Sequence, residues 1–306
     1  MKNIFMNKHT IQECLCRLDK KGIDYIFVGD SSLLLNWPVQ INKLGNSTFS
    51  FYTGVSVNNI KSQINDKNLV ILKNELKDSN QKQGNFIYTF NPQLGFTVIA
   101  ELFKEKLVPG IHKTAFIEYG AVIGKNCFIG AFSFIGKDVI IGNNVVIEEG
   151  CVVKNKVVIK DNVIIRSGVK LGNPGMGSIK DNKGRFHDFV HFGDIIIEND
   201  VVIADNTVIN QGTLNTTTIM EGTRIGPNNW IAHGVTIGKF CFISQGINIA
   251  GSCIINDNCW IAPGAVIRDG VIIGNNVTIG MGTVVTKDIP ENECWIGIPA
   301  KKLRNQ

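Results

Sequence analysis

The stretch of sequence that decides the fold is residues 225–243, which read IGPNNWIAHGVTIGKFCFI. An isoleucine occurs at every sixth position in this stretch, and the same register continues on both sides of it. A period of six fits neither an amphipathic helix, with about 3.6 residues per turn, nor a strand that alternates every two residues. The uninterrupted aliphatic positions are Ile219, Ile225, Ile231, Ile237, Ile243, Ile249, Ile255, Ile261, Ile267, Ile273, Ile279 and Val285.

The same register begins much earlier and is interrupted twice. It resumes at Ile197, Ile203 and Ile209 after a break, and then slips by four residues at positions 213–216. Three short strands joined by tight turns would form one triangular coil, with the aliphatic residues stacked inside, so the repeat predicts a parallel β-solenoid. The earlier aliphatic positions are Ile111, Ile117, Ile123, Ile129, Ile135, Ile141, Ile147, Val153, Ile159, Ile165 and Leu171.

The first 107 residues lack this register and predict a small α/β domain. We expect strands over 25–28, 48–52, 70–72 and 86–90, and helices over 10–21 and 93–104. The predicted domains are therefore 1–107, a β-helix over 108–288 with an inserted loop at 173–194, and a C-terminal tail over 289–306.

Composition narrows the class of protein. The net charge of +5 is mild, and no run of like charges concentrates it, so we expect no nucleic-acid partner. No apolar run approaches the roughly 18 residues that a membrane span needs, and residues 1–5 offer no signal-peptide apolar region. The eight cysteines contain no CxxC pair, which favours reduced thiols in a cytoplasmic protein.

The first interruption, residues 173–194, predicts a loop on one face of the solenoid, which is often the binding face. Arg185, Phe186 and His187 are its candidate substrate contacts, and a plain surface loop is the alternative. His187 and His191 have the spacing of a helical metal pair, but the stretch has no helical pattern and no third ligand. We therefore predict no metal site.

The hexads resemble those of the hexapeptide acyltransferases, which form a left-handed parallel β-helix, over about residues 108–290. The resemblance implies a homotrimer with active sites in the clefts between neighbouring prisms. Residues 205–217 and 228–238 are similar to the glucosamine N-acyltransferase of lipid A biosynthesis and to related nucleotide-sugar N-acyltransferases. Through this resemblance, substrate contacts are expected at Asn210, Asn215, Asn228 and Asn229.

The family's general base is the histidine of its I-A-H step, which corresponds to His233. N-acylation needs an unprotonated amine, and a histidine that titrates near neutral pH can accept the amine's proton. The family commonly has an acidic residue where this chain has Gly226, which leaves Asn228 and Asn229 as candidates to orient the imidazole. The alternative is that His233 is a surface histidine on a solenoid turn.

The N-terminal module resembles the uridine-binding domain of the lipid A enzyme. The similarity lies in TFSF at 48–51 and NPQLGF at 91–96. The resemblance implies that Phe51 stacks on a pyrimidine, although a phenylalanine in a strand is usually core. Val57 and Gly54 stand where the family has Tyr and Asn, so the base is left open.

The C-terminal GIPAKK at 297–302 resembles the end of CoA-dependent sugar and serine acetyltransferases, where the tail closes over the pantetheine arm. The resemblance implies contacts between Lys301, Lys302 and Arg304 and the phosphates of CoA, as basic side chains bind phosphate elsewhere. Gly251 and Ser252 fit the same donor site. A solvated basic tail is the alternative.

These observations predict an N-acyltransferase that moves an acetyl or short hydroxyacyl group from acyl-CoA to the amine of a nucleotide-linked amino sugar, for a bacterial surface glycan. Acyl-CoA would be a cosubstrate, with no bound cofactor. One alternative is the UDP-3-O-acylglucosamine N-acyltransferase of lipid A biosynthesis, which uses acyl carrier protein. Another is a non-catalytic solenoid that binds a nucleotide sugar or serves as a scaffold.

Overall fold

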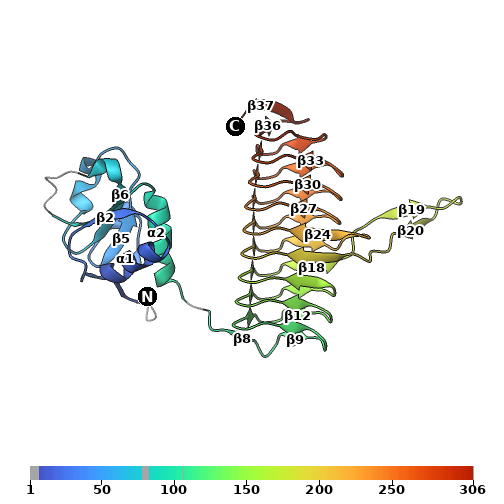
Figure 1. Cartoon of the computed structure of the whole chain (residues 1–306), viewed down its shortest axis with the longest axis horizontal. Helices are drawn as coiled ribbons and strands as arrows, with labels where there is room; N and C mark the ends of the chain where they lie inside the picture. Colours follow the sequence, from blue (N-terminus) through green and yellow to red (C-terminus); the bar gives the residue numbers. More distant parts are fainter. Residues whose placement is uncertain (1–6, 78–82, 106, 306) are drawn as a thin grey trace. The chain divides into compact units, whose positions relative to one another are not determined.

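A computed structural model describes residues 7–77, 83–105 and 107–305. The chain divides into two compact units, residues 1–107 and 108–306. The first is a small α/β unit and the second a β-solenoid of stacked coils (Figure 1), so the predicted fold class is confirmed. Residues 1–5, on which the signal-peptide expectation rests, lie outside the described residues. No helix in the described ranges is long and apolar enough to cross a membrane.

The N-terminal unit is built on a five-stranded sheet in the order β2-β7-β6-β5-β4, in which only the pairing of β2 with β7 is antiparallel. A separate pair, β1 and β3, is also antiparallel. The bounds are β1 (His9–Thr10), β2 (Tyr25–Val28), β3 (Leu34–Leu35), β4 (Trp37–Pro38), β5 (Thr48–Phe51), β6 (Leu69–Lys73), β7 (Asn85–Thr89), α1 (Ile11–Lys20), α2 (Pro92–Ala100), and 3-10 turns at Ile41–Lys43, Val57–Gln63, Asn74–Leu76 and Glu101–Phe103.

Alternate residues of the central strands fill two cores. Ile71 and Ile87 pack with α1 and α2, whereas Val70 and Tyr88 pack on the other face with Ile60.

Each helix begins where its sequence provides a cap. Thr10 and Glu13 form a capping box for α1, and the Asn91 side chain accepts a hydrogen bond from the Leu94 backbone N–H at the start of α2. The second helix is shorter than predicted, because the α-helical part ends at Ala100 and a 3-10 turn follows.

The solenoid has three sheets that follow one another around each coil. Sheet 1 contains β8 (Gly110–Ile111), β11 (Phe128–Ile129), β14 (Val146–Ile147), β17 (Ile164–Ile165), β22 (Val202–Ile203), β25 (Arg224–Ile225), β28 (Phe242–Ile243), β31 (Trp260–Ile261), β34 (Thr278–Ile279), β36 (Glu293–Ile296) and β37 (Lys301–Asn305). Sheet 2 contains β9 (Phe116–Ile117), β12 (Phe134–Ile135), β15 (Val152–Val153), β18 (Lys170–Asn173), β23 (Val208–Asn210), β26 (Trp230–Ile231), β29 (Asn248–Ile249), β32 (Val266–Ile267) and β35 (Val284–Val285). Sheet 3 contains β10 (Val122–Ile123), β13 (Ile140–Ile141), β16 (Val157–Ile159), β21 (Asp194–Ile197), β24 (Thr216–Ile219), β27 (Thr236–Ile237), β30 (Ile254–Ile255) and β33 (Ile272–Ile273).

The predicted aliphatic residues form the core of the solenoid. In a typical strand the first residue points outward and the second inward, as strand geometry requires. Thus Ile140 is exposed whereas Ile141, its neighbour, is buried. Residues 293–305, expected as a tail, continue the solenoid, because β36 pairs with β34 and β37 returns antiparallel to β36.

Five of the eight cysteines lie at inner corners of the coils. Cys151 Sγ donates to the carbonyl of Arg166 at 3.0 Å, and Ser133 Oγ and Thr223 Oγ1 make the equivalent bond 15 residues ahead. Burial raises the pKa of Cys151 to about 11, so its thiol is protonated at neutral pH. All eight cysteines are free. The others that donate in this way are Cys127, Cys241, Cys253 and Cys259.

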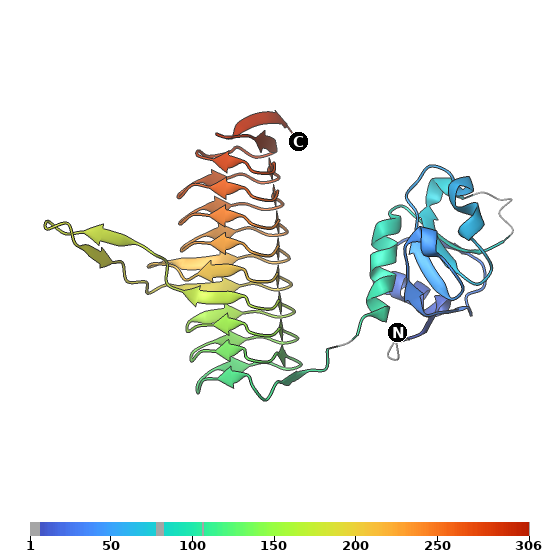
Figure 2. The same ribbon diagram turned by 180° about the vertical axis from the view of Figure 1, so that it is seen from behind.

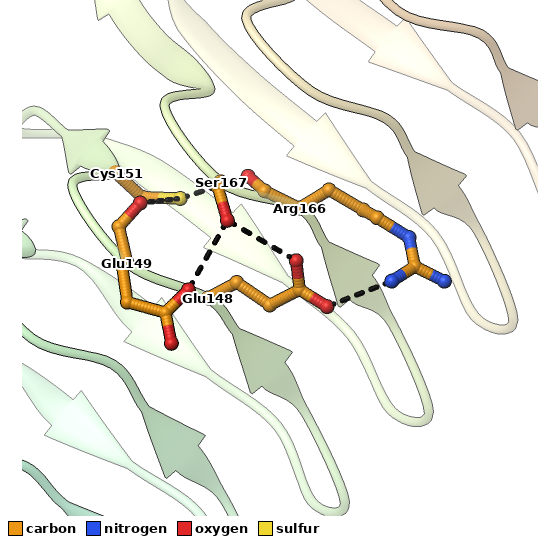
Figure 3. Close-up of polar contacts among 5 residues, drawn as sticks. All are labelled: Glu148, Glu149, Cys151, Arg166 and Ser167. Carbon is orange, nitrogen blue, oxygen red and sulfur yellow. Dashed lines mark hydrogen bonds and ion pairs between the residues drawn. The ribbon is translucent and has the colours of Figure 1, made fainter. Parts of the chain in front are cut away.

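Outward-facing side chains at the corners also connect successive coils. In Figure 3, Arg166 pairs with Glu148 at 2.8 Å, and Ser167 Oγ donates to the carboxylates of Glu148 and Glu149 at 3.3 and 3.1 Å. The arginine is nearly half exposed, so such a pair contributes at most about 1 kcal/mol. We conclude that the buried aliphatic stacks, and not these surface contacts, stabilise the solenoid.

Left-handed corner positions explain the asparagine runs. Asn144 has φ of 56°, and its side chain joins a ladder with Asn126 and Asn162. A residue with a Cβ is strained in this conformation, and Asn tolerates it better than most.

Asn144→Ala should therefore be less stable than Asn144→Gly. Both variants lose the amide ladder, so the difference isolates the left-handed backbone and should be about 1 kcal/mol. The midpoint of urea unfolding, followed by far-UV circular dichroism, measures it. An alanine variant as stable as the glycine variant would contradict the assignment.

Candidate active site

Both interruptions of the repeat lie at one corner of the solenoid. Sheet neighbours are 18 residues apart in the regular coils, but 38 apart across the first interruption and 22 apart across the second. The first interruption lies between β18 and β21 and the second between β23 and β24, which in both cases is where the chain passes from sheet 2 to sheet 3. The first interruption is a hairpin of β19 (Ser178–Lys180) and β20 (Phe186–Asp188) that projects from the solenoid (Figure 2).

His233 lies at the same corner, one coil further along. It follows β26 of sheet 2 and precedes β27 of sheet 3. The register that pairs Ile231 with Ile249 places Gly251 directly on the next coil. The hairpin, the second interruption, His233 and Gly251 therefore occupy the same corner of four successive coils.

The imidazole of His233 is enclosed by two glycines. A Cβ on Gly251 would lie 2.5 Å from Cε1 and 2.7 Å from Nε2 of His233, so a side chain at Gly251 would displace the ring. A Cβ on Gly175, which belongs to the hairpin, would lie 3.0 Å from Cδ2 of His233. The backbone N–H of Ser252 donates to the His233 carbonyl at 2.9 Å and so fixes the turn.

A second histidine faces His233. The ring of His191 lies 5.5 Å from that of His233, centroid to centroid, with the planes at 64°. Neither ring nitrogen of His233 has a hydrogen-bond partner among the described residues. Burial, and next the neighbouring His191, lower the pKa of His233 below its ordinary value. The imidazole is therefore neutral at neutral pH and can accept a proton.

Asn215 and Asn210 lie at this corner as well. The amide of Asn215 lies against the backbone of Gly234, because a Cβ there would be 2.6 Å from Asn215 Nδ2. Asn210 is buried at the end of β23, and its carbonyl accepts a hydrogen bond from Thr217 Oγ1, which in turn accepts one from the Gly234 N–H. Both residues are thus next to the turn that carries His233.

Asn228 and Asn229 lie at a different corner, between β25 of sheet 1 and β26 of sheet 2. Asn229 is buried; its amide donates to the carbonyls of Gly226 and Ser244 and accepts from the N–H of Ile247. These backbone contacts occupy the whole amide, so its role in the structure is to support the corner. Asn228 is exposed with φ of 57°.

The hairpin candidates gather around Asp181. Its carboxylate accepts from Arg185 Nε at 3.0 Å and His187 Nε2 at 3.1 Å, and Lys180 Nζ lies 4.9 Å from the centre of the Phe186 ring. All three candidates, Arg185, Phe186 and His187, are exposed on the projecting part of the hairpin. The hydrogen bond from His187 is the main cause that lowers the pKa of Asp181.

The basic C-terminal candidates lie on β37, at the end of sheet 1 (Figure 1). Lys302 pairs with Glu293, whose other oxygen accepts from Trp295 Nε1 at 2.7 Å. Lys301 and Arg304 are exposed. Strand β37 stands four strands above β28 in sheet 1, so a ligand that reaches from His233 to β37 must extend about 20 Å along the solenoid.

The N-terminal unit has a separate pocket of about 540 Å³. Phe51 lines it, is half-buried, and packs against Phe96 with ring centroids 4.9 Å apart. A pocket lined by aromatic and aliphatic side chains with a few polar groups suits a planar ring such as a nucleobase. The other lining residues are Pro38, Val39, Gln40, Ile41, Ser50, Tyr52 and Thr53.

Among the residues that the structure describes, no group of three or more His, Cys, Asp or Glu could hold a metal ion. Sequence reasoning did not identify His191 as the neighbour of His233. The hexapeptide register contained the information needed, because counting it places the hairpin that carries His191 at the same corner as His233.

Comparison with known proteins agrees with this architecture. The family model of the bacterial transferase hexapeptide (six repeats) matches residues 120–155, 138–173 and 252–287. No curated protein matches the chain. Several solved structures share the solenoid.

The UDP-N-acetylglucosamine acyltransferase from Campylobacter jejuni is 24% identical, with a TM-score of 0.58 over 64% of this chain and 75% of its own. That from Francisella novicida is 21% identical, with a TM-score of 0.59 over 64% of this chain and 71% of its own. LpxA from Acinetobacter baumannii is 25% identical, with a TM-score of 0.58 over 64% of this chain and 74% of its own. The chain is therefore a hexapeptide-repeat β-solenoid protein with the fold of these solved acyltransferases, preceded by an α/β unit.

Proposed function

We propose that this protein is an N-acyltransferase that uses His233 as a general base. The observation that carries the proposal is a half-buried imidazole, without a hydrogen-bond partner among the described residues, at the corner where both interruptions of the repeat lie. The likeness to solved UDP-N-acetylglucosamine acyltransferases supports acyl transfer to a nucleotide-linked sugar. The acceptor would be an amino sugar that serves a bacterial surface glycan.

The reaction follows from the geometry of the corner. The substrate amine attacks the thioester carbonyl, a nitrogen–carbon bond forms, and a ring nitrogen of His233 accepts the amine's proton. The tetrahedral intermediate then expels the thiolate, which takes the proton back from His233. Gly251 lies against the imidazole and its backbone N–H has no partner in the described parts of the chain, which makes this N–H our candidate to stabilise the oxyanion.

Acyl-CoA is the proposed donor. Gly251 and Ser252 would line its acyl end, and Lys301 and Arg304 are the exposed basic groups for its phosphates. Lys302 already pairs with Glu293, which makes it the weaker candidate. CoA carries its thioester on a long flexible arm, which would have to extend about 20 Å along the solenoid and also pass around the coil, because β37 belongs to sheet 1 whereas His233 lies at the corner between sheets 2 and 3.

Exposed apolar residues next to the corner favour a second candidate, a long hydroxyacyl chain delivered by acyl carrier protein as in lipid A biosynthesis. Met176, Phe189, Val190, Phe192 and Leu214 are all exposed in the two interruptions. A hydrocarbon chain would cover such side chains, whereas an acetyl group would not. Assays of the same purified protein with an acyl-CoA thioester and with an acyl-carrier-protein thioester distinguish the two donors, because only the true donor should support rapid transfer.

His233→Ala should lower the turnover by about 100-fold or more, because the amine then loses its proton acceptor. Release of free thiol from acyl-CoA, with a panel of UDP- and dTDP-linked amino sugars, measures it. His112→Ala is the matched control, since His112 is exposed on the first coil. Unchanged turnover in His233→Ala would contradict the proposed role. Nucleotide-sugar binding without thiol release from wild type would favour a non-catalytic scaffold.

We also propose that the Phe51 pocket binds the pyrimidine of the nucleotide sugar. Phe51→Leu keeps an apolar side chain but removes the stacking face, so the KM for the nucleotide sugar should rise about tenfold with kcat little changed. Phe90→Leu is the control, because Phe90 is exposed in the same unit. An unchanged KM would make Phe51 an ordinary packing residue.

The proposal includes a homotrimer. Outward strand positions of sheet 3 expose Val122 and Ile140 toward one end of the sheet and Ile254 and Ile272 toward the other, and exposed apolar side chains of this kind are what a subunit interface would cover. Light scattering of the purified protein should give three times the mass of one chain. A monomer at micromolar concentration would contradict this part of the proposal.

A further inference from the structure

The two interruptions of the repeat are hydrogen-bonded to one another. The side chain of Gln211, in the second interruption, donates to the carbonyl of His191 at 2.9 Å. The backbone N–H of Phe192 donates to the carbonyl of Thr213 at 2.7 Å. The backbone N–H of Gly193 is shared between the carbonyls of Gly212 and Thr213, each at 3.1 Å. The four-residue insertion therefore holds the returning limb of the hairpin on the solenoid.

Two glycines make this approach possible. A Cβ on Gly193 would lie 2.0 Å from the Asn215 carbonyl oxygen, and a Cβ on Gly212 would lie 1.8 Å from the same atom. Neither position tolerates a side chain without a shift of the backbone. The backbone next to His191 is thus fixed by close packing as well as by hydrogen bonds.

The ring of His191 is also held in orientation. Its Nδ1 lies 2.9 Å from the carbonyl oxygen of Phe189, and a carbonyl only accepts, so Nδ1 carries the proton. That leaves Nε2 as the acceptor nitrogen. A Cβ on Gly175 would lie 2.8 Å from this Nε2, so Gly175 sits against both histidine rings.

Few charged groups surround the pair. Lys156 Nζ donates to the Phe192 carbonyl at 3.2 Å, Asp194 begins the strand after the hairpin, and Asp269 occupies the same corner two coils above His233. Across the described ranges, His191 is the only titratable group with a resolved influence on His233. Two imidazolium ions at this separation repel one another, so the pair resists double protonation.

We propose that His191 is a positioning residue for His233: the inserted hairpin brings a second imidazole to the corner and thereby keeps His233 free to accept the substrate's proton. This reading rests on the proposed function, in which His233 is the base. A carboxylate partner would stabilise the imidazolium form of the base. A histidine partner does the opposite and favours return of the proton to the leaving thiolate.

The test replaces the second imidazole and follows His233 directly. His191→Asn keeps a donor for the Phe189 carbonyl, and His191→Phe keeps an aromatic ring; both remove the titrating group. The chain has five histidines, so Cε1-labelled protein gives five NMR signals, and His233→Ala identifies the one from His233. Titration of the substrate-free full chain then gives the pKa of His233.

In both variants the pKa of His233 should rise toward its ordinary value of 6.5 without reaching it, because burial, the larger cause, remains. The acidic limb of the kcat profile should move to higher pH with it, whereas a merely structural role would lower kcat equally at every pH. His187→Asn, on the same hairpin, should leave the pKa of His233 unchanged.

The two proposals fail separately. An unshifted pKa of His233 in both variants of an active enzyme overturns the role of His191 alone. A shifted pKa in a protein that releases no thiol supports the histidine pair and contradicts the proposed acyl transfer.

Discussion

Everything in the solenoid depends on the stacking of one coil on the next. In the regular coils each strand pairs with the strand 18 residues away, and the buried aliphatic residues of successive coils pack on one another. This constraint keeps most strands short and in one register, and the longer strands β18, β21 and β24 and the register shift at Leu171–Asn173 lie beside the interruptions. Variation is allowed only at the corners, where the backbone turns in solvent.

The candidate site follows from this restriction. Two interruptions that differ in length, one a hairpin and one of four residues, share a corner, and the next coil carries His233 there. Gly251 on the following coil leaves room for the imidazole. The stack of coils therefore presents one histidine against a hairpin that the second interruption holds in place, and beside it lies a backbone N–H with no partner in the described part of the chain. Such preorganisation is what acyl transfer requires of a protein scaffold.

Much of this could be predicted from the sequence, and the reason is the period. Once Ile231 and Ile249 are assigned to equivalent positions, the stacking of Gly251 on His233 follows by counting. Strands β2, β5, β6 and β7 of the N-terminal unit were also predicted within a residue or two, because their apolar runs are clearly bounded, whereas the two-residue strands β1, β3 and β4 were not predicted. The role of the five solenoid-corner cysteines could not be predicted from composition, because it depends on their hydrogen bonds to carbonyls 15 residues ahead.

The parts that could not be predicted lie outside the period. The path of the hairpin depends on Gly193 and Gly212 lying against Asn215, a contact that no local pattern indicates. The approach of His191 to His233 depends in turn on that path. Asn229 was a candidate through the family resemblance and as a partner for His233, yet strand β26 separates the two residues, and the Asn229 amide supports the corner at the other end of that strand.

The central claim is that acyl transfer takes place at the His233 corner. The most direct measurement is an experimental structure of His233→Ala with a non-hydrolysable acyl-CoA analogue and a nucleotide-linked amino sugar bound. Our account predicts the analogue's carbonyl beside the Gly251 N–H and the sugar amine within reach of the missing imidazole. Ligands bound only at other corners, with the position of residue 233 open to solvent, would contradict it.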